Sequence, residues 1–462
     1  MTEELRAMFK SKKVILLGIG ISNMPLAYML TDMGAKIEIR DKRTAAEIPE
    51  YESLCALGAE FVLGEGYLSD MQADYIFRTP GLRPDVPGLN EARKRGIPVV
   101  SEMGMFLKNA PCRVIAVTGS DGKSTTTTLI SKILEKEMGE ENVFLGGNVG
   151  TPLLHRIGDM KDQSIVAAEL SSFQLMDIDC NASVAVIKNI TPNHLNWHTD
   201  MNEYIEAKAR ILKGAKKAVL NFDDSICREL SSRTSSPIIW FSRRPVSPSQ
   251  CNEAVYPDNG YIVHRKGEKC ERIVALSDIL LPGEHNIENY STAIAATAGI
   301  ASKESVAYVA KNFKGVHHRL ELVCEKRGVR FYNSSIDSSP TRTAAAISAL
   351  NIPINIICGG YDKNIPFEPL ADALIGCKYI RSVTLTGATM EKIYSCLTAH
   401  PDFAGSGIIL NTEKDFKDAV LKAAETAKEG ECVLLSPACA SFDAFKNFEA
   451  RGEFFAKIVN EM

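Results

Sequence analysis

A strand, a glycine-bracketed turn and a helix in the first third of the chain constrain the fold most. Four apolar residues at 114–117 are followed by Gly119 and Gly122, then by Lys123, Ser124 and a helical apolar pattern. Glycines at such a turn leave backbone N–H groups at a helix N-terminus, where the helix dipole favours a polyphosphate. The spacing G-x-x-G-K-S is two residues shorter than the usual phosphate loop, so a strand-to-helix turn without a ligand is the alternative.

The polar residues of this turn suit a nucleotide that carries a metal ion. Lys123 is long enough to reach the β- and γ-phosphates as a point charge. The hydroxyl of Ser124 or Thr125 is a ligand of the type that holds Mg²⁺ beside those phosphates. We therefore predict phosphate binding at this turn.

The composition argues against several classes of protein. A chain of 462 residues is too long for one ordinary core, so about three domains are expected. A net charge of −4 argues against a nucleic-acid-binding surface. The 12 cysteines contain no CxxC pair and the chain starts with polar residues, so we expect reduced thiols in a cytoplasmic protein. No apolar run approaches the roughly 20 residues that span a membrane.

The N-terminal stretch has the pattern of a β-α-β unit. An apolar run at 14–17 leads into G-x-G at 18–20, and residues 35–41 alternate like a second strand that ends at Asp41. This pattern resembles the first half of a Rossmann domain, with Asp41 near the position of a ribose-binding acid. Asn23 replaces the third glycine, so NAD, another nucleotide and a turn without a ligand remain open. We rank a sugar nucleotide first because of motifs further along the chain.

Three polar residues stand out in the central region. Glu169 directly follows the apolar run 165–168, where a Mg²⁺-binding acid sits in a parallel α/β sheet; a solvated strand end is the alternative. His194 follows the apolar run 182–190, and we favour a role at the metal site over a structural one. Lys208 lies among small residues of a predicted helix, and its spacing alone favours a solvated side chain.

The last third of the chain alternates strands and helices again. Predicted strands at 330–333, 355–360, 382–387 and 432–436 indicate another doubly wound sheet. Before it, residues 231–275 are expected to form short antiparallel strands that cover a sheet edge. Ligands bind at the carboxyl ends of such strands. Two polar segments lie there, GGYDK at 359–363 and SPACASFD at 436–443.

Seven motifs, in this order and spacing, resemble those of the Mur ligase family over essentially the whole chain. They are TGSDGKST (118–125), GGNVG (146–150), ELSSFQL (169–175), EHNIEN (284–289), HHRLE (317–321), GGYDK (359–363) and SPACASFDAFKNFEARGEFF (436–455). The last one is most similar to the branch that attaches D-glutamate. The resemblance implies an α/β protein of three domains. These are a Rossmann-like UDP-substrate domain at 1–110, a P-loop ATPase-like central ATP-binding domain at 111–316 and a Rossmann-like D-glutamate-binding domain at 317–462.

The resemblance implies an ATP-dependent amide-bond ligase. In this family ATP phosphorylates the carboxylate of UDP-N-acetylmuramoyl-L-alanine, and the amine of D-glutamate attacks the acyl phosphate. A tetrahedral intermediate then collapses to the amide. Phosphoryl transfer of this kind needs positioning and neutralised charge rather than a protein nucleophile. The resemblance also implies two Mg²⁺ ions, a carbamylated lysine at Lys208, and a monomer in cytoplasmic peptidoglycan precursor synthesis.

The resemblance also assigns residues to each ligand. The implied catalytic residues are Lys123, Glu169, His194 and Lys208. The implied ATP contacts are Gly119, Ser120, Asp121, Gly122, Lys123, Ser124, Thr125, Asn286 and Arg319. The implied UDP-substrate contacts are Ser22, Asp41, Lys42, Asn148, Ser171 and Gln174. The implied D-glutamate contacts are Lys363, Ser441, Phe442 and Phe448, and the implied metal ligands are Ser124, Thr125, Glu169, His194 and Lys208.

One segment departs from the family pattern. Where the family often shows N-D-S-K-A-T, residues 333–338 read N-S-S-I-D-S, so the acid and the lysine are missing from their usual positions. Whether Asp337 replaces the acid is open, as is a glutamate contact by Ser338. Two alternatives therefore remain. One is a nucleotide-binding regulatory paralogue without ligase activity. The other is an NAD-dependent dehydrogenase, which leaves the central phosphate loop without a role.

Overall fold

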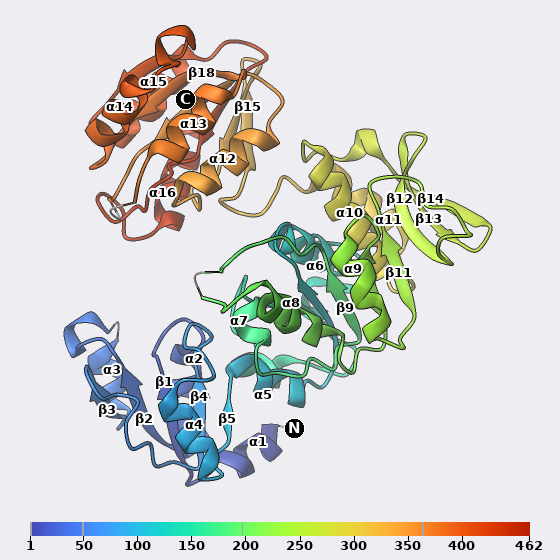
Figure 1. Ribbon diagram of the computed structural model, residues 1–462, viewed down its shortest axis with the longest axis vertical. Coiled ribbons are helices and arrows are strands. Elements are labelled where there is room, and N and C mark those ends of the chain that lie inside the picture. Colours follow the sequence, from blue (N-terminus) through green and yellow to red (C-terminus); the bar gives the residue numbers. More distant parts are fainter. Residues whose placement is uncertain (1, 49, 196, 363–364) are drawn as a thin grey trace. The chain divides into compact units, whose positions relative to one another are not determined.

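The computed structural model describes residues 2–48, 50–195, 197–362 and 365–462. It is a mixed α/β structure with three sheets, each flanked by helices (Figure 1). Its contacts group into two compact units. One contains residues 1–278 and 287–310, and the other, called the C-terminal unit here, contains residues 279–286 and 311–462.

The first sheet has five parallel strands in the order β3-β2-β1-β4-β5. The strands are β1 (Lys13–Leu17), β2 (Lys36–Asp41), β3 (Glu60–Leu63), β4 (Tyr75–Arg78) and β5 (Val99–Val100). The helices are α1 (Thr2–Phe9), α2 (Asn23–Asp32), α3 (Tyr51–Ala56), α4 (Pro87–Lys94) and α5 (Glu102–Asn109). The strand order reverses between β1 and β4, so the glycine turn after β1 lies at the crevice where ligands bind in such sheets.

The second sheet has nine strands in the order β14-β13-β12-β11-β10-β9-β6-β8-β7. The strands are β6 (Arg113–Thr118), β7 (Val143–Gly147), β8 (Ile165–Glu169), β9 (Val184–Ile187), β10 (Ala218–Asn221), β11 (Ile238–Phe241), β12 (Glu253–Asp258), β13 (Tyr261–Lys266) and β14 (Lys269–Ala275). The helices are α6 (Lys123–Met138), α7 (Ser172–Leu175), α8 (Met201–Ala209), α9 (Ser225–Leu230), α10 (Glu284–Thr297) and α11 (Lys303–Asn312). Strand β6 lies between β8 and β9, so the segments after these three strands meet at one edge.

The prediction for residues 231–275 was right about the sheet edge and wrong about part of the pairing. Strands β11 and β12 continue the parallel sheet, while β13 pairs antiparallel with both β12 and β14. A parallel pair needs a connection that returns the chain to the same end of the sheet. The irregular, polar sequence of this segment gives no sign of such a connection.

The third sheet has the order β15-β16-β20-β17-β18-β19, and all its strands except β15 run parallel. The strands are β15 (Glu321–Lys326), β16 (Val329–Asn333), β17 (Ile354–Cys358), β18 (Ile380–Leu385), β19 (Ile409–Thr412) and β20 (Cys432–Leu435). The helices are α12 (Pro340–Ala349), α13 (Glu368–Gly376), α14 (Met390–Ala399), α15 (Phe416–Thr426) and α16 (Phe448–Glu461). The predicted doubly wound sheet is confirmed.

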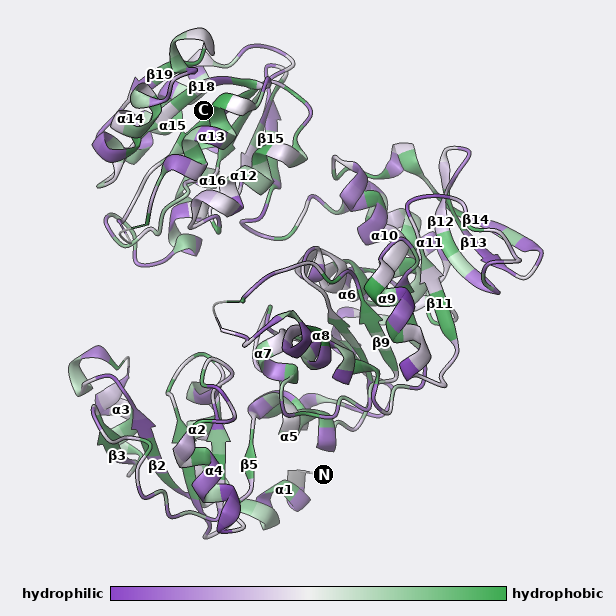
Figure 2. Ribbon diagram, in the orientation of Figure 1, coloured by the Kyte–Doolittle hydropathy of each residue, from purple (hydrophilic) through white to green (hydrophobic). Residues whose placement is uncertain are grey.

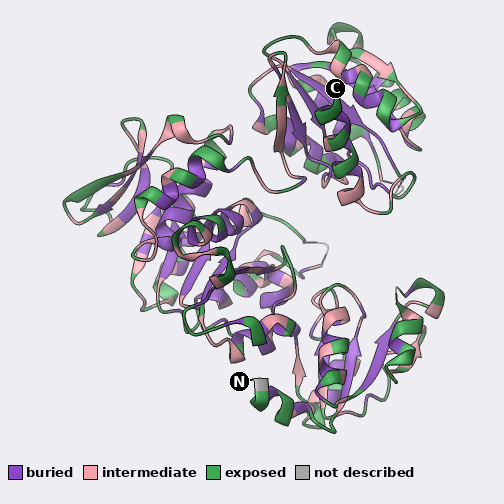
Figure 3. Cartoon of the chain, turned by 180° about the vertical axis from the view of Figure 1, so that it is seen from behind, coloured by how far each residue is buried: buried purple, intermediate pink, exposed green. Residues whose placement is uncertain are grey.

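The cores lie on both faces of the inner strands. Every residue of β9, β17 and β20 is buried, as expected for parallel strands covered by helices on both sides. Hydrophobic residues concentrate on such strands, whereas hydrophilic residues are frequent on a helix such as α8 (Figure 2). The view from behind shows the strands buried and the outer helix faces exposed (Figure 3).

The predicted α/β class with three sheets is confirmed, and each sheet lies within one of the three expected stretches. The domain boundaries near 110 and 316 stay a prediction. All twelve cysteines are free thiols. In the part of the chain that the structure describes, no helix combines the length and the apolarity needed to cross a bilayer.

We expect Gly147→Ala to destabilise the central sheet more than Gly260→Ala. Both glycines have positive φ angles, 95° and 80°, so an L side chain costs about 1–2 kcal/mol at either site. A Cβ at Gly147 would also lie 2.2 Å from the carbonyl oxygen of Glu169, while one at Gly260 meets nothing within 4 Å. Overpacking adds roughly 1–3 kcal/mol. Urea unfolding of both variants measures the difference, and equal unfolding midpoints would contradict the close approach of β7 to β8.

Candidate functional site

The glycine-bracketed turn lies between the end of β6 and the start of α6. Gly119 and Gly122 have φ angles of 154° and 75°. A Cβ atom would lie 2.7 Å from Cβ of Lys188 at the first position and 2.6 Å from Oδ1 of Asn289 at the second. Only glycine fits at both positions, because β9 and α10 press against the turn. Asn289 has no role assigned from the sequence, yet it contacts the turn.

Asn189, two residues after β9, holds the turn from one side. Its Oδ1 accepts hydrogen bonds from the backbone N–H groups of Ser120, at 3.0 Å, and Asp121, at 2.8 Å. Its main-chain oxygen accepts a further one from Ser120 at 2.9 Å. The hydroxyl of Ser120 lies 2.9 Å from that of Tyr204 and accepts from the N–H of Thr191. Helix α6 begins at Lys123, and the N–H groups in the first turn of a helix have no acceptor within that helix, so a phosphate would bind at this end.

The side chain of Lys208 lies beneath this turn. Only 1% of Lys208 is exposed, and its Nζ donates to the carbonyl oxygen of Gly119 at 2.7 Å. Burial, reinforced by the positive charge of Lys123, lowers the pKa of Lys208 well below its usual range. The spacing-based expectation of a solvated lysine is therefore wrong. Helix α8 turns this residue against the end of β6, a contact that helix periodicity alone does not reveal.

Glu169 ends β8 opposite Val117 of β6. The residue is 1% exposed, and its Oε1 accepts from Nδ2 of Asn148 at 2.8 Å. Its Oε2 is buried with no hydrogen-bond partner in the described part of the chain. A buried carboxylate oxygen without a donor is costly, and a hard divalent cation is the partner it would suit. Ser124 and Thr125, in the first turn of α6 after the neighbouring strand, supply the hydroxyl ligands predicted for such an ion.

His194 lies on the exposed turn after β9, with a φ of 55° and its ring 4.9 Å from the ring of Phe173. A second histidine, His198, was not predicted and is 2% exposed. Its Nε2 lies 2.9 Å from the hydroxyl of Ser172, and its Nδ1 lies 3.1 Å from Glu203. The aromatic residues around His198 in the sequence are the only signal that marks it as buried.

The three predicted contacts to the muramoyl-alanine end lie around Glu169. Asn148 is bonded to its carboxylate, and Ser171 and Gln174 follow it in the chain. Ser171 caps α7: its hydroxyl accepts from the N–H of Gln174 at 3.3 Å, and Oε1 of Gln174 accepts from the N–H of Ser171 at 2.9 Å. This reciprocal cap fixes the direction of both side chains.

The predicted uridine-pocket residues gather at the glycine turn after β1. Oδ2 of Asp41 accepts from the N–H of Ile19 at 2.9 Å, and both of its oxygens accept from Arg43. Burial opposes ionisation, but the hydrogen bonds from Arg43 and Ile19 outweigh it and lower the pKa of Asp41 to about 2. Ser22 is the half-buried N-cap position of α2, and Lys42 is exposed. Asp41 thus holds the turn that carries Ser22.

In the C-terminal unit the predicted D-glutamate residues follow β20. Ser441 is buried, whereas Phe442 is 63% exposed and its ring lies 6.0 Å from that of Tyr361. Phe448 begins α16, and its carbonyl oxygen accepts from the hydroxyl of Ser335 at 2.8 Å. Lys363 lies outside the described residues.

The predicted nucleotide contacts of the C-terminal unit lie near its start. Asn286 is buried, and its Nδ2 donates to the carbonyl oxygen of Pro282 at 2.7 Å. Arg319 is half-buried, on the segment before β15. Asp337, the displaced acid, is buried and accepts from the hydroxyl of Ser436 at 2.9 Å. Burial raises the pKa of Asp337.

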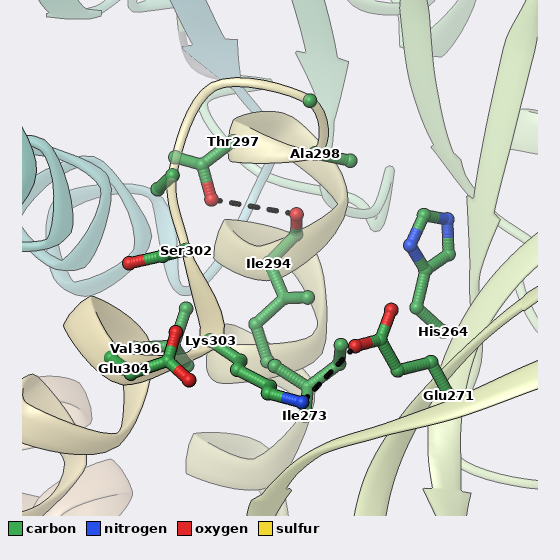
Figure 4. A pocket seen from close by; sticks show the side chains of 12 residues that line it. His264, Glu271, Ile273, Ile294, Thr297, Ala298, Ser302, Lys303, Glu304 and Val306 are labelled. Carbon is green, nitrogen blue, oxygen red and sulfur yellow. Dashed lines mark hydrogen bonds and ion pairs between the residues drawn. The ribbon is translucent and has the colours of Figure 1, made fainter.

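A cavity of about 310 Å³ lies away from these residues, against β13, β14, α10 and α11 (Figure 4). Two of its charged groups, Lys303 and Glu271, form an ion pair at 3.5 Å. None of the residues that line it is a predicted site residue. The chemistry of the turn therefore does not extend into this cavity.

Comparisons with known proteins decide the family. The family model described as the Mur ligase middle domain matches residues 117–297. A UDP-N-acetylmuramoylalanine–D-glutamate ligase of Ruminiclostridium cellulolyticum is 42% identical over 468 residues, covering 100% of this chain and 99% of the relative. The ligase of the same name from Clostridium perfringens is 40% identical over 464 residues, covering 99% of each. The chain belongs to the Mur ligase family.

Two solved structures share the fold of this Mur ligase. The UDP-N-acetylmuramate–alanine ligase of Thermotoga maritima matches with a TM-score of 0.58 at 17% identity, over 97% of this chain and 99% of that one. A pseudomurein peptide ligase type C of Methanothermus fervidus matches with a TM-score of 0.53 at 16% identity, over the same shares. These likenesses bear on the fold alone.

We expect Asn189→Ala to weaken ATP binding by this Mur ligase. The substitution removes the oxygen that accepts from two backbone N–H groups of the turn, each worth about 0.5–1.5 kcal/mol. The dissociation constant for an ATP analogue with Mg²⁺ should therefore rise roughly 5- to 100-fold, as calorimetric titration would show. Asn252→Ala, at an exposed asparagine between β11 and β12, is the matched control. Unchanged affinity in Asn189→Ala would show that the turn keeps its shape without this carboxamide.

Proposed function

We propose that this Mur ligase joins D-glutamate to UDP-N-acetylmuramoyl-L-alanine at the expense of ATP, in peptidoglycan precursor synthesis. The proposal rests on 40–42% identity, along the whole chain, with ligases named for that reaction. The phosphate loop, with Lys123 and Glu169 beside it, supports the ATP-dependent half of the reaction. The seven motifs support the choice of substrates.

The first step transfers a phosphoryl group. A carboxylate oxygen of the muramoyl-alanine attacks the γ-phosphorus, the bond to ADP breaks, and an acyl phosphate forms. The start of α6 directs N–H groups and a positive dipole at the phosphates, and Lys123 adds a full charge. The amine of D-glutamate then attacks the acyl carbon, loses a proton, and phosphate leaves. The chain supplies no nucleophile of its own in either step.

We assign one Mg²⁺ to Glu169 with Ser124 or Thr125, because Oε2 of Glu169 is buried without a hydrogen-bond donor in the described part of the chain. A second Mg²⁺ is assigned to His194 and a modified Lys208. When bound, such ions neutralise the charge that develops on the phosphates. Asn148 holds the other oxygen of Glu169 and so fixes the direction of the free one.

We further infer that Lys208 carries a carbamate. Its lowered pKa favours the neutral amine, which is the form that attacks the carbon of CO₂. An N–C bond forms and one proton leaves to solvent, which gives an anion suited to Mg²⁺. One N–H remains on Nζ, so the hydrogen bond to the carbonyl oxygen of Gly119 can persist and orient the carbamate.

The remaining assignments follow the family motifs. Uridine is assigned to Ser22, Asp41 and Lys42, the muramoyl-alanine end to Asn148, Ser171 and Gln174, the nucleotide to residues 119–125, Asn286 and Arg319, and D-glutamate to Lys363, Ser441, Phe442 and Phe448. The domains are assigned to 1–110, 111–316 and 317–462.

The nucleotide substrates are intracellular metabolites, so we place the reaction in the cytoplasm. We propose a monomer, which light scattering would test.

A phosphate-release assay tests the function. With UDP-N-acetylmuramoyl-L-alanine, ATP and Mg²⁺, we expect release that depends on D-glutamate. Lys123→Ala should lower kcat by at least ~100-fold, the usual cost of losing one transition-state charge contact, with an unchanged circular dichroism spectrum. ATP binding without release would favour the regulatory paralogue. Nicotinamide-dependent turnover would favour the dehydrogenase.

We expect charge sign to decide the role of Lys208. Lys208→Ala should be nearly inactive and partly rescued by high acetate, while Lys208→Arg should stay inactive because it cannot form a carbamate. Lys213→Ala, at a lysine of which 66% of the side chain is exposed, is the matched control. With ¹³C-bicarbonate, the wild type should show a carbamate carbon signal in NMR that Lys208→Arg lacks. An active Lys208→Arg enzyme would remove the carbamate from the mechanism.

A further inference from the structure

His198 forms a hydrogen-bonded chain that the assigned roles do not use. The residue is 2% exposed, and its two ring nitrogens contact Ser172 at 2.9 Å and Glu203 at 3.1 Å. Rings surround it, with those of Trp197 at 4.8 Å and Tyr204 at 5.2 Å between centroids. A histidine so enclosed, with both nitrogens in hydrogen bonds, has one orientation.

Glu203 links His198 to Arg83, which follows a strand of the first sheet. Arg83, on the segment after β4, donates to Oε1 of Glu203 at 2.8 Å and to the carbonyl oxygen of Trp197 at 2.7 Å. The N–H of Thr199 donates to Oε2 at 2.9 Å. The hydrogen bonds from Arg83 lower the pKa of Glu203 to about 2, so the carboxylate is charged. The Nδ1 of His198 is therefore the donor to Glu203.

This fixes the tautomer of the ring. With the proton on Nδ1, Nε2 accepts from the hydroxyl of Ser172. Every polar atom between Arg83 and Ser172 then has a defined donor or acceptor role.

His198 contacts two segments that carry predicted site residues. Ser172 is the first residue of α7, between Ser171 and Gln174. The N–H of His198 donates to the carbonyl oxygen of His194 at 3.0 Å, which closes the turn that carries that histidine. The ring of Phe173 packs against both parts, at 4.9 Å from His194. One buried side chain thus joins the muramoyl-alanine segment to the metal-site turn.

The hydrogen-bonded series Ser172–His198–Glu203 has the residue types of a hydrolytic triad, but it is not one. Ser172 is 2% exposed and its hydroxyl is bonded to the ring. A nucleophile must reach a substrate atom, and this hydroxyl cannot do so without leaving its site. These residues therefore position other parts of the site and take no part in a covalent step.

We propose that His198 is a positioning residue, which with Glu203 and Arg83 fixes the Ser171–Gln174 segment against the His194 turn for binding of the UDP-linked substrate. The inference rests on the proposed function, because it takes Ser171 and Gln174 as contacts to that substrate. Errors of about 1 Å in such a segment cost roughly 100-fold in rate.

Three variants separate the two hydrogen bonds. In His198→Gln the amide oxygen can still accept from the hydroxyl of Ser172. In His198→Asn the shorter amide can still donate to Glu203, but the bond to Ser172 is lost. Ser172→Ala removes the same bond as His198→Asn. His264→Gln is the matched control, because His264 is also bonded to a glutamate, at 2.9 Å, on strand β13.

We expect His198→Asn and Ser172→Ala to raise KM for UDP-N-acetylmuramoyl-L-alanine and to lower kcat, together roughly 10- to 100-fold in kcat/KM. KM for ATP should stay within about twofold, and His198→Gln should retain most of the activity. A merely structural role would raise both KM values or lower the active fraction alone, and either result overturns the proposal. Wild-type kinetics in His198→Asn and Ser172→Ala would overturn it as well.

Fluorescence gives a readout that does not depend on turnover. The chain has 2 tryptophans, so Trp240→Phe leaves Trp197 as the sole reporter, with its indole N–H 3.2 Å from the carbonyl oxygen of Gly81. His198→Asn in that background should shift the emission to longer wavelength, and His264→Gln should not. Absence of D-glutamate-dependent phosphate release in the wild type would refute the proposed function. An unshifted emission would refute the positioning role.

Discussion

The phosphate loop keeps its shape because other elements occupy its remaining hydrogen-bonding groups. Oδ1 of Asn189 accepts from two successive N–H groups, and Nζ of Lys208 donates to the carbonyl oxygen of Gly119. Each partner comes from β9 or from α8, which follow the loop by about seventy residues or more along the chain. The loop is thus a product of the parallel sheet, since only the order β9-β6-β8 brings these groups beside it.

Two lysines at one loop need different charges. Lys123 is half-buried in the first turn of α6, and its Nζ donates to the carbonyl oxygen of Ser120 at 2.9 Å. Lys208 lies beneath the loop, and burial together with the charge of Lys123 disfavours a second ammonium there. Burial therefore favours the neutral amine of Lys208, whereas Lys123 keeps partial contact with solvent. At the end of β8, Oε2 of Glu169 is buried without a hydrogen-bond partner in the described part of the chain.

The sequence shows the periodic elements better than the contacts between them. Apolar runs before Gly119, Glu169 and the turn of His194 predicted the strands β6, β8 and β9, because a buried parallel strand has few other patterns. The burial of Lys208 was not predictable from helix spacing, since several faces of α8 are compatible with its pattern. The burial of His198 was not predictable either, because its hydrogen-bond partners, Ser172 and Glu203, lie on helices α7 and α8. Short edge strands such as β3, β15 and β19 carry too weak a pattern to be found.

The altered segment at 333–338 is held mainly by a residue outside it. Arg451, on α16 and 2% exposed, donates to the hydroxyl and carbonyl oxygens of Ser335 and to the carbonyl oxygens of Cys439 and Ala440. Burial lowers the pKa of Arg451 to about 10, which still leaves the guanidinium charged near neutral pH. Its four acceptors belong to the segments after β16 and β20, so it fixes these two segments to each other. The conformation of this segment therefore does not depend on an acid at 334 or a lysine at 336, and the buried carboxylate of Asp337 adds a contact to Ser436 rather than replacing that framework.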